Sequence, residues 1–261
     1  MAATYLDRIV AYHRNRVDAD ARSLDTLIAQ ALSQPASRGF RAALERDSSQ
    51  HLAVIAEIKR RSPSKGDLFP GLDPAELAST YEACGATCMS VLTDEPHFGG
   101  SAADLQTARR SCGLPVIRKD FTLGPRDVCD ARIMGADCVL LIAAALSPKE
   151  LCEFHALATS IGLDVLVEIH DDKELEVALA AEATLVGVNQ RDLVTFQVDH
   201  ERALRMASLM PRGVVRVAES GVRNGDDAAS LRQAGYHAVL VGESLVTARD
   251  TCASLKALLV A

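Results

Sequence analysis

Apolar and polar positions divide the chain into short apolar runs and longer segments with helical spacing. The apolar runs are rich in β-branched residues and predict eight strands, near Val54–Lys59, Cys88–Leu92, Val116–Lys119, Cys138–Ile142, Val165–Glu168, Leu185–Val188, Val214–Ala218 and Ala238–Val241. Helical spacing predicts helices between them, over Pro74–Cys84, Ala102–Cys112, Pro125–Met134, Pro148–Ser160, Asp172–Ala181, Glu201–Leu209 and Asp226–Gln233. The strands are mostly continuous apolar runs, which is typical of a parallel sheet covered on both faces.

Eight strands in strict strand–helix order predict an α/β fold, a closed (β/α)8 TIM barrel. An open doubly wound sheet is the alternative, but the first strand–helix turn carries no GxGxxG motif. We expect a single barrel domain over residues 1–261, in which residues 1–50 form an N-terminal helical extension. Helices expected at Tyr5–Val17 and Phe40–Arg46 would cover the bottom of the barrel or flank its mouth.

Composition and charge narrow the class of protein. With 48% hydrophobic residues, the chain can bury enough apolar surface to fold, which excludes disorder. It has 28 Lys and Arg against 35 Asp and Glu, a net charge of -7, and only 4% aromatic residues. Nucleic-acid-binding proteins are expected to show a basic excess and exposed aromatic rings, so no nucleic-acid partner is predicted.

Cysteine usage and the N-terminus indicate a cytoplasmic protein. The seven cysteines are odd in number and none has CxxC spacing, so we expect reduced thiols rather than a disulfide framework or structural zinc. Residues 1–17 carry scattered charge and no apolar core, unlike a signal peptide. The longest apolar run, Cys138 to Leu146, is too short to span a bilayer, so no membrane partner is predicted.

Charged residues lie within or at the ends of the predicted strands, where barrel active sites form. Glu57 and Lys59 are two residues apart in the first strand and therefore project to the same side, with Ile55. Further polar residues end the third, fifth, sixth and seventh strands: Lys119, Glu168, Asn189 and Glu219. Two ammonium groups and three carboxylates around one cavity suit general acid–base chemistry without a metal or organic cofactor. The alternatives are a buried ion pair for the first two residues and solvated rim positions for the others.

The ends of the seventh and eighth strands predict a phosphate site. Ser220 and Gly221 follow Glu219, and the eighth strand runs into Gly242, Glu243 and Ser244. Phosphate commonly binds between these two loops of a barrel, on backbone N–H groups at the start of a short helix. The alternative is two ordinary strand–helix turns.

Other loops supply candidate contacts for an anionic, flat substrate. Residues 60–66 are basic, hydroxyl-rich and end in Gly66, which favours a mobile lid over a solvated charge run. Arg191 offers a second anion contact, and Phe98 and Phe121 either wall a pocket for a flat ring or pack in the core. The seven histidines form no HxH or HExxH pattern, so no metal site is predicted.

The segments at the strand ends resemble the indole-3-glycerol phosphate synthase family. The first of these runs from Ile55 through Glu57, Lys59 and Ser62 to Gly66. The resemblance continues through Val91–Ser101, Pro115–Phe121, Leu166–His170, Gly187–Leu193, Ala218–Val222 and Val241–Leu245, and it includes the N-terminal segment Leu6–Tyr12. Two departures are His97, where the family often has an aromatic residue, and Gln190, where a small polar residue is common.

The resemblance implies a carboxy-lyase of tryptophan biosynthesis that needs no cofactor. Its substrate would be 1-(2-carboxyphenylamino)-1-deoxyribulose 5-phosphate, which undergoes ring closure, decarboxylation and dehydration. The phosphate would bind at Ser220, Gly221, Gly242, Glu243 and Ser244. The benzoate would meet Lys59, Arg191, Ser62, Phe98 and Phe121.

The resemblance also implies roles in proton transfer. Lys119 would be the general acid of ring closure, and Glu168 and Lys59 are both candidates for the proton transfers of dehydration. Glu57, Asn189 and Glu219 would hold hydroxyl groups and tune the two lysines. We expect a small phosphorylated substrate as the partner and a monomer or weak homo-oligomer. The alternative functions are phosphoribosylanthranilate isomerase and a non-catalytic barrel that binds a phosphorylated metabolite.

Overall fold

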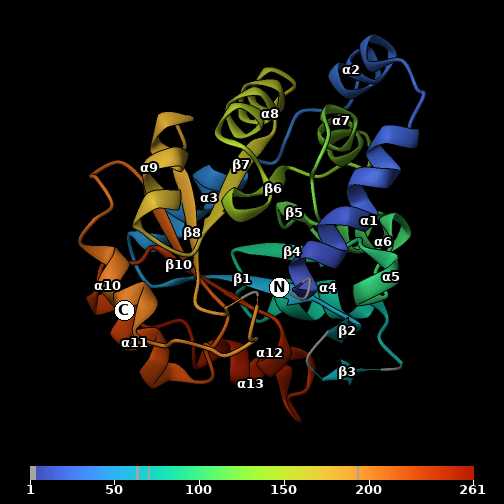
Figure 1. Cartoon of the computed structure of the whole chain (residues 1–261). Coiled ribbons are helices and arrows are strands. Elements are labelled where there is room, and N and C mark those ends of the chain that lie inside the picture. The colour runs from blue at the N-terminus through green and yellow to red at the C-terminus, as the bar shows by residue number, and fades with distance from the viewer. Residues whose placement is uncertain (1–3, 63–64, 70, 193) are drawn as a thin grey trace.

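A computed structural model describes residues 4–62, 65–69, 71–192 and 194–261. Eight parallel strands form a closed barrel with the order β1-β10-β9-β8-β7-β6-β5-β4. These strands are β1 (Ala53–Ile58), β4 (Cys88–Leu92), β5 (Val116–Lys119), β6 (Cys138–Ile142), β7 (Asp164–Ile169), β8 (Leu185–Asn189), β9 (Val215–Glu219) and β10 (Ala238–Val241). Helices lie between successive strands, so the predicted (β/α)8 barrel is confirmed (Figure 1).

The strands divide their side chains between the barrel interior and the surrounding helices. On β1, Ile55 belongs to the interior apolar cluster, whereas Val54, Ala56 and Ile58 belong to the cluster shared with the helices. This alternation follows from the two-residue period of a strand and places Glu57 on the interior side, as the sequence predicts. The floor of any cavity in the barrel is therefore set by inward residues such as Ile55.

Most helices of the outer layer begin at a residue whose side chain caps the first turn. The helices of this layer are α4 (Pro74–Ala83), α6 (Ala102–Ser111), α7 (Pro125–Ile133), α8 (Pro148–Ser160), α9 (Asp172–Ala180), α10 (Arg202–Ala207), α11 (Gly225–Gln233) and α13 (Thr251–Lys256). Asp73 accepts the Ala75 N–H before α4, and Ser147 and Glu150 form a capping box at the start of α8. Shorter elements occupy the loops at the strand ends: α5 (Glu95–Phe98), the 3-10 turn η1 (Ala143–Ala145), α12 (Glu243–Val246) and the two-stranded hairpin β2 (Arg61–Ser62) and β3 (Gly66–Asp67).

The helices that precede β1 take both positions expected of them. In α3 (Phe40–Ser48), Phe40 and Leu44 are fully buried in the interior apolar cluster, so this helix closes the N-terminal end of the barrel. In α1 (Tyr5–Ala19), Arg14 bonds to Glu150 at 2.6 Å and to the Leu123 carbonyl at 2.9 Å, which fixes the helix beside the mouth. An additional helix, α2 (Leu24–Leu32), was not predicted and packs on α7.

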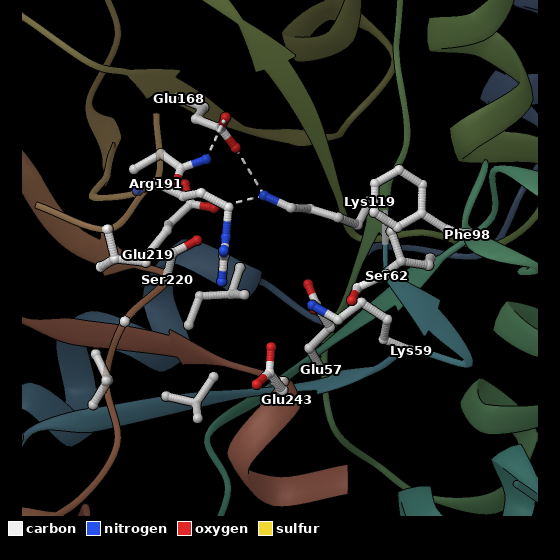
Figure 2. A pocket seen from close by; sticks show the side chains of 18 of the residues that line it. Glu57, Lys59, Ser62, Phe98, Lys119, Glu168, Arg191, Glu219, Ser220 and Glu243 are labelled. Carbon is white, nitrogen blue, oxygen red and sulfur yellow. Dashed lines mark hydrogen bonds and ion pairs between the residues drawn. The ribbon is translucent and has the colours of Figure 1, made fainter. Parts of the chain in front are cut away.

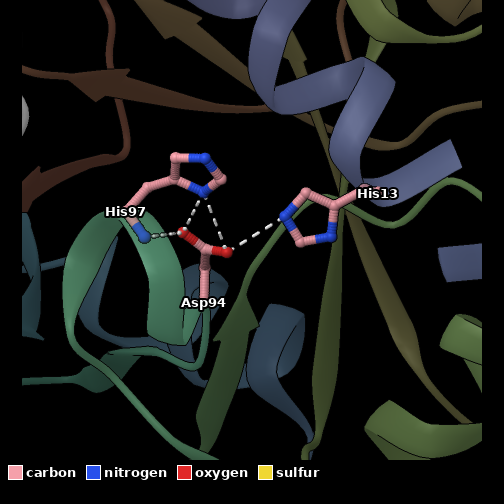
Figure 3. Close-up of side chains that lie close together, drawn as sticks. All are labelled: His13, Asp94 and His97. Carbon is pink, nitrogen blue, oxygen red and sulfur yellow. Dashed lines mark hydrogen bonds and ion pairs between the residues drawn. The ribbon is translucent and has the colours of Figure 1, made fainter. Parts of the chain in front are cut away.

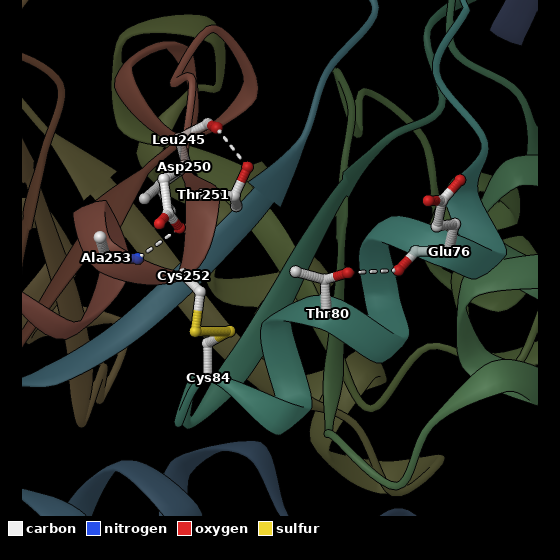
Figure 4. Close-up of a disulfide and its surroundings, with 8 residues drawn as sticks. All are labelled: Glu76, Thr80, Cys84, Leu245, Asp250, Thr251, Cys252 and Ala253. Atoms are coloured by element: carbon white, nitrogen blue, oxygen red, sulfur yellow. Dashed lines mark hydrogen bonds between the residues drawn. A yellow bond between two sulfur atoms is a disulfide. The ribbon is translucent and has the colours of Figure 1, made fainter.

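A disulfide joins Cys84, at the end of α4, to Cys252 in α13, with 5.2 Å between their Cα atoms (Figure 4). The expectation of seven reduced thiols is therefore wrong for this pair. The two cysteines are 168 residues apart, and barrel closure brings the first helix after β1 next to the last helix of the chain. Sequence spacing cannot reveal such a pair. The other five cysteines are free.

None of the helices in the described parts of the chain has the length and the apolar character that crossing a bilayer requires.

Candidate active site

A cavity of about 420 Å³ opens at the C-terminal ends of the strands (Figure 2). All fifteen side chains or glycines predicted from the sequence line it: Glu57, Lys59, Ser62, Phe98, Lys119, Phe121, Glu168, Asn189, Arg191, Glu219, Ser220, Gly221, Gly242, Glu243 and Ser244. The closed barrel explains this convergence, because the carboxyl ends of all eight parallel strands meet at one rim. Their placement together is a property of the structure, whereas their chemical roles remain predictions.

Lys119 is held between two buried carboxylates. Its Nζ atom donates to Glu168 Oε2 at 2.8 Å and to Glu219 Oε2 at 2.6 Å (Figure 2). Burial lowers the pKa of the Lys119 ammonium, but the charges of Glu168 and Glu219 outweigh burial and hold that pKa above its usual value. Lys119 is therefore a charged proton donor at neutral pH.

The two carboxylates around Lys119 differ in proton affinity. Burial raises the pKa of Glu168, but Lys119 more than compensates and the net pKa is lowered. Asn189 Nδ2 also donates to Glu168 Oε1 at 2.9 Å, which favours its ionised form. Burial raises the pKa of Glu219 to about 7 against the opposing charge of Lys119, and the negative charge of Glu168 adds to the increase. The site thus holds one strongly ionised carboxylate beside a second that titrates near neutrality.

A second ion pair lies on β1. Lys59 Nζ is 2.7 Å from Glu57 Oε1, and Ser90 Oγ donates to Glu57 Oε2 at 3.3 Å. Gly242, after the neighbouring strand β10, leaves the space that this carboxylate fills, because a Cβ atom there would lie 2.4 Å from Glu57 Oε1. The pair therefore depends on a glycine nearly 200 residues away in sequence, at the predicted phosphate site.

In the two loops predicted to bind phosphate, the side chains of Ser244 and Glu243 already have partners within the protein. Ser220 and Gly221 both have positive φ, 65° and 76°, and a Cβ atom on Gly221 would lie 2.5 Å from Val198. Ser244 Oγ donates to the Val222 carbonyl at 3.2 Å, so its hydroxyl is engaged with the neighbouring loop. The Glu243 carboxylate forms an ion pair with Lys65. A carboxylate cannot donate to phosphate, so any contribution of Glu243 to anion binding comes from its backbone N–H.

An apolar wall and one guanidinium complete the cavity. The ring centroids of Phe98 and Phe121 are 6.4 Å apart, and Leu92 also lines the cavity. Arg191 is oriented by a bond from Nη1 to the Phe196 carbonyl at 3.1 Å. The backbone N–H of Arg191 donates to Asn189 Oδ1 at 3.0 Å, which ties the backbone of this loop to the carboxylate network through Asn189.

The loop after β1 reaches across the mouth. Arg60 forms a two-bond pair with Asp104, and Arg61 pairs with Asp67 at 2.8 Å within the β2–β3 hairpin. Lys65 lines the cavity and contacts Glu243, a contact that sequence reasoning missed. The expected lid includes Pro63 and Ser64, which lie outside the described residues.

Three residues beside the cavity form an unpredicted cluster of His13, Asp94 and His97 (Figure 3). His13 Nε2 and His97 Nδ1 each lie 3.0 Å from the Asp94 carboxylate, and one ligand atom from each residue lies within 4.8 Å of the others. A metal-bound imidazole normally donates its second N–H to an acceptor. His13 Nδ1 is buried and lacks a partner in the described structure, so the cluster fits a metal poorly. We interpret it as a hydrogen-bonded contact that anchors α1 to α5.

Comparison with known proteins identifies the family. A family model described as "Indole-3-glycerol phosphate synthase" matches residues 6–258. A protein named indole-3-glycerol phosphate synthase from Chloroherpeton thalassium is 42% identical over 253 residues, which are 96% of this chain and 97% of that protein. The solved structure of thiamine phosphate pyrophosphorylase from Pyrococcus furiosus is similar in fold, with a TM-score of 0.61 and 17% identity over 82% of this chain and 95% of its own. The family match and the identity to a full-length relative show that this chain belongs to the indole-3-glycerol phosphate synthase family.

Proposed function

We propose that the indole-3-glycerol phosphate synthase activity of this carboxy-lyase resides in the 420 Å³ cavity, with Lys119 as the general acid. The observation that carries the proposal is the pairing of Lys119 with both Glu168 and Glu219. These contacts hold the ammonium in place and keep it protonated. The isomerase and the non-catalytic barrel considered from the sequence are not favoured by the family match.

The substrate phosphate binds at the loops after β9 and β10 in this proposal. Gly221, Gly242 and the first two residues of α12, Glu243 and Ser244, line the cavity, and backbone N–H groups at the start of a helix are suited to binding an anion. Because Glu243 pairs with Lys65, the loop after β1 is coupled to the phosphate end of the cavity. In this proposal, a bound phosphate competes with the Glu243 carboxylate for the Lys65 ammonium, and the loop after β1 rearranges when Lys65 changes partner.

The carboxyphenyl ring occupies the opposite, apolar side. Phe98 and Phe121 provide the wall, and Lys59 and Arg191 provide cations for the carboxylate, with Ser62 at the edge of the cavity. Burial of the ring between apolar side chains positions its carboxyl-bearing carbon against the ketone carbon of the sugar chain.

Ring closure then proceeds with proton donation by Lys119. The aromatic carbon attacks the ketone carbon, the C=O electron pair moves to oxygen, and the Lys119 ammonium donates a proton to that oxygen. Closure leaves an iminium in the ring, which accepts the electron pair of the breaking carbon–carboxylate bond as carbon dioxide leaves. This electron sink is part of the substrate, so the step requires no further group from the protein.

Dehydration follows with Glu168 as the base and Lys59 as the acid. Before ring closure, the charge of Lys119 lowers the pKa of Glu168. When Lys119 gives up its proton, that charge disappears and the carboxylate becomes more basic. Glu168 is then able to take the proton from the carbon next to nitrogen while Lys59, paired with Glu57, protonates the leaving hydroxyl.

The direct test is to mix the purified chain with the substrate and follow indole fluorescence. The chain has no Trp, so the background is low. Formation of indole-3-glycerol phosphate supports the proposal, and isomerised or unchanged substrate contradicts it.

We also infer that residues 1–261 act as one barrel domain, monomeric or weakly associated, in the cytoplasm and without a nucleic-acid partner. The net charge of -7 supports the last point, since it opposes binding to a polyanion. Five free cysteines support a reducing compartment, although the Cys84–Cys252 disulfide is unusual there.

A further inference from the structure

A histidine outside the cavity contacts the far side of Glu168. His170 directly follows the last residue of β7, Ile169, and is two residues beyond Glu168. Its Nε2 atom is buried, has no hydrogen-bond partner among the residues described, and lies 3.7 Å from Glu168 Oε1. His170 does not line the cavity, so its contact with the chemistry runs through Glu168.

Glu174 fixes the orientation of the His170 ring. Oε2 of Glu174, on the first turn of α9, accepts the His170 backbone N–H at 2.7 Å and lies 3.0 Å from His170 Nδ1. An ionised carboxylate is only an acceptor, so Nδ1 must carry the hydrogen of this contact. The ring cannot then rotate away, and Nε2 is aimed at Glu168.

The Nε2 atom of His170 is therefore either unprotonated or protonated, and the two states have different effects on Glu168. In the neutral ring it presents a lone pair to a carboxylate oxygen, and the two acceptors repel. In the protonated ring it presents an N–H, which stabilises the ionised form of Glu168. The charged groups that face His170 are Glu168 on β7, Glu174 on α9 and Arg202 on α10. Burial lowers the pKa of His170, but Glu174 and Glu168 together raise it above the usual value, against a smaller opposing effect of Arg202.

We propose that His170 is a positioning residue that sets the protonation state of Glu168, with Glu174 holding its ring. The proposal rests on the proposed function of Glu168 as the base of dehydration. In this arrangement the His170 ring, held by Glu174, lies beside the Glu168 carboxylate and can carry a proton without lining the cavity where substrate would bind. While His170 is charged, Glu168 remains ionised, even after Lys119 has lost its proton.

The test compares pH profiles of kcat and KM for His170→Asn and Glu174→Gln with those of the wild type. Loss of the cation raises the pKa of Glu168, so the acidic limb of kcat moves to higher pH by about one unit for His170→Asn. Below the midpoint of that limb kcat therefore falls about tenfold, the equivalent of one pKa unit, whereas kcat at neutral pH and KM stay within about twofold of wild type. Glu174→Gln keeps an acceptor oxygen but removes a charge, so its shift has the same direction and is smaller. The matched control is His155→Asn on α8, away from the cavity, with an unchanged profile.

An unmoved acidic limb in both variants, or a loss confined to KM, overturns the proposal. If His170→Asn does not fold, Glu174→Gln and an NMR titration of the His170 ring decide the matter. The ring is expected to titrate at lower pH in Glu168→Gln than in the wild type, and an unchanged titration overturns the coupling. Activity measurements distinguish a wrong role for Glu168 from a wrong role for His170. If Glu168→Gln still forms product, the base assignment fails. If that variant is inactive while His170→Asn keeps the wild-type profile, only the role of His170 fails.

Discussion

Nζ of Lys119 on β5 lies 2.6 Å from Oε2 of Glu219 on β9, so one ion pair connects two strands on opposite sides of the barrel. The interior is narrow enough for a lysine and a glutamate side chain to span it together. Both groups are buried, and removing Lys119 would leave two buried carboxylates without their cation, which is costly. The contact therefore fixes Lys119 at the centre of the cavity and links its protonation to two carboxylates at once.

Lys119→Ala is expected to abolish turnover while phosphate-bearing substrate analogues still bind. The variant removes the proton donor for the ketone oxygen and leaves the loops after β9 and β10 unchanged. Steady-state rates and analogue titrations measure the two effects separately. Lys149→Ala, at an exposed position of α8, is the control and keeps full activity. A variant at position 119 that retains more than about a tenth of kcat, a barrier change of only about 1.4 kcal/mol, excludes Lys119 as the acid.

Glu219→Gln is expected to move the alkaline limb of kcat to lower pH. The carboxylates of Glu168 and Glu219 raise the pKa of Lys119, and the neutral amide removes one of these contributions. The ammonium then loses its proton at lower pH, by about one unit, so the general acid is depleted earlier. The pH profile of product formation measures the shift, with the exposed Glu153→Gln as control. An alkaline limb that stays in place or moves upward disagrees with this role of Glu219.

Gly242→Ala is expected to lower kcat/KM by about a hundredfold, because misplacement of catalytic groups by about 1 Å has effects of that size. The new Cβ atom would lie 2.4 Å from Glu57 Oε1 and would displace Glu57 together with Lys59. Kinetics with the natural substrate measure the loss, and a thermal melt reports the accompanying strain. Gly71→Ala is the matched control, since its Cβ atom would meet only a Phe69 ring atom at 3.9 Å. Wild-type kinetics in Gly242→Ala would show that the carboxylate can move without consequence.

The Cys84–Cys252 disulfide is expected to stabilise the barrel. It closes a long loop of chain, since the cysteines are 168 residues apart, and such cross-links typically contribute about 2–5 kcal/mol by restricting the unfolded state. Cys252→Ser should therefore lower the Tm of the oxidised protein and match wild type treated with a reductant. Cys152→Ser, at an exposed free cysteine, serves as the control. Equal melting of oxidised and reduced wild type would mean that the bond adds no stability.

Much of the fold followed from local patterns. Continuous apolar runs separated by helical segments identified all eight barrel strands, and the two-residue period placed Glu57 on the interior side of β1. Helix α2 was missed because it lies in the extension before the first strand, where no alternation of strands and helices indicates its position. The β2–β3 hairpin was missed because two-residue strands carry no periodicity.

The sequence predicted which residues gather at the candidate site, but not which of them contact one another. Residues such as Lys119 and Glu168 were found because polar side chains at the ends of parallel strands must share one rim. His170 carried a usable signal, its position two residues after Glu168 at the end of β7. The His13–Asp94 contact carried none, because these two residues are 81 positions apart in sequence and lie on elements that share no local pattern.

The sequence by itself determined the barrel, the family resemblance and the residues that gather at its mouth, because strand and helix periods are local and the rim of a closed barrel collects every strand end. Only the tertiary structure decided the partners: Lys119 between two carboxylates, Glu243 on Lys65, and Cys84 bonded to Cys252. These pairings depend on barrel closure and on how far each side chain reaches across it. The order of residues along the chain does not specify how far apart two side chains lie once the barrel has closed.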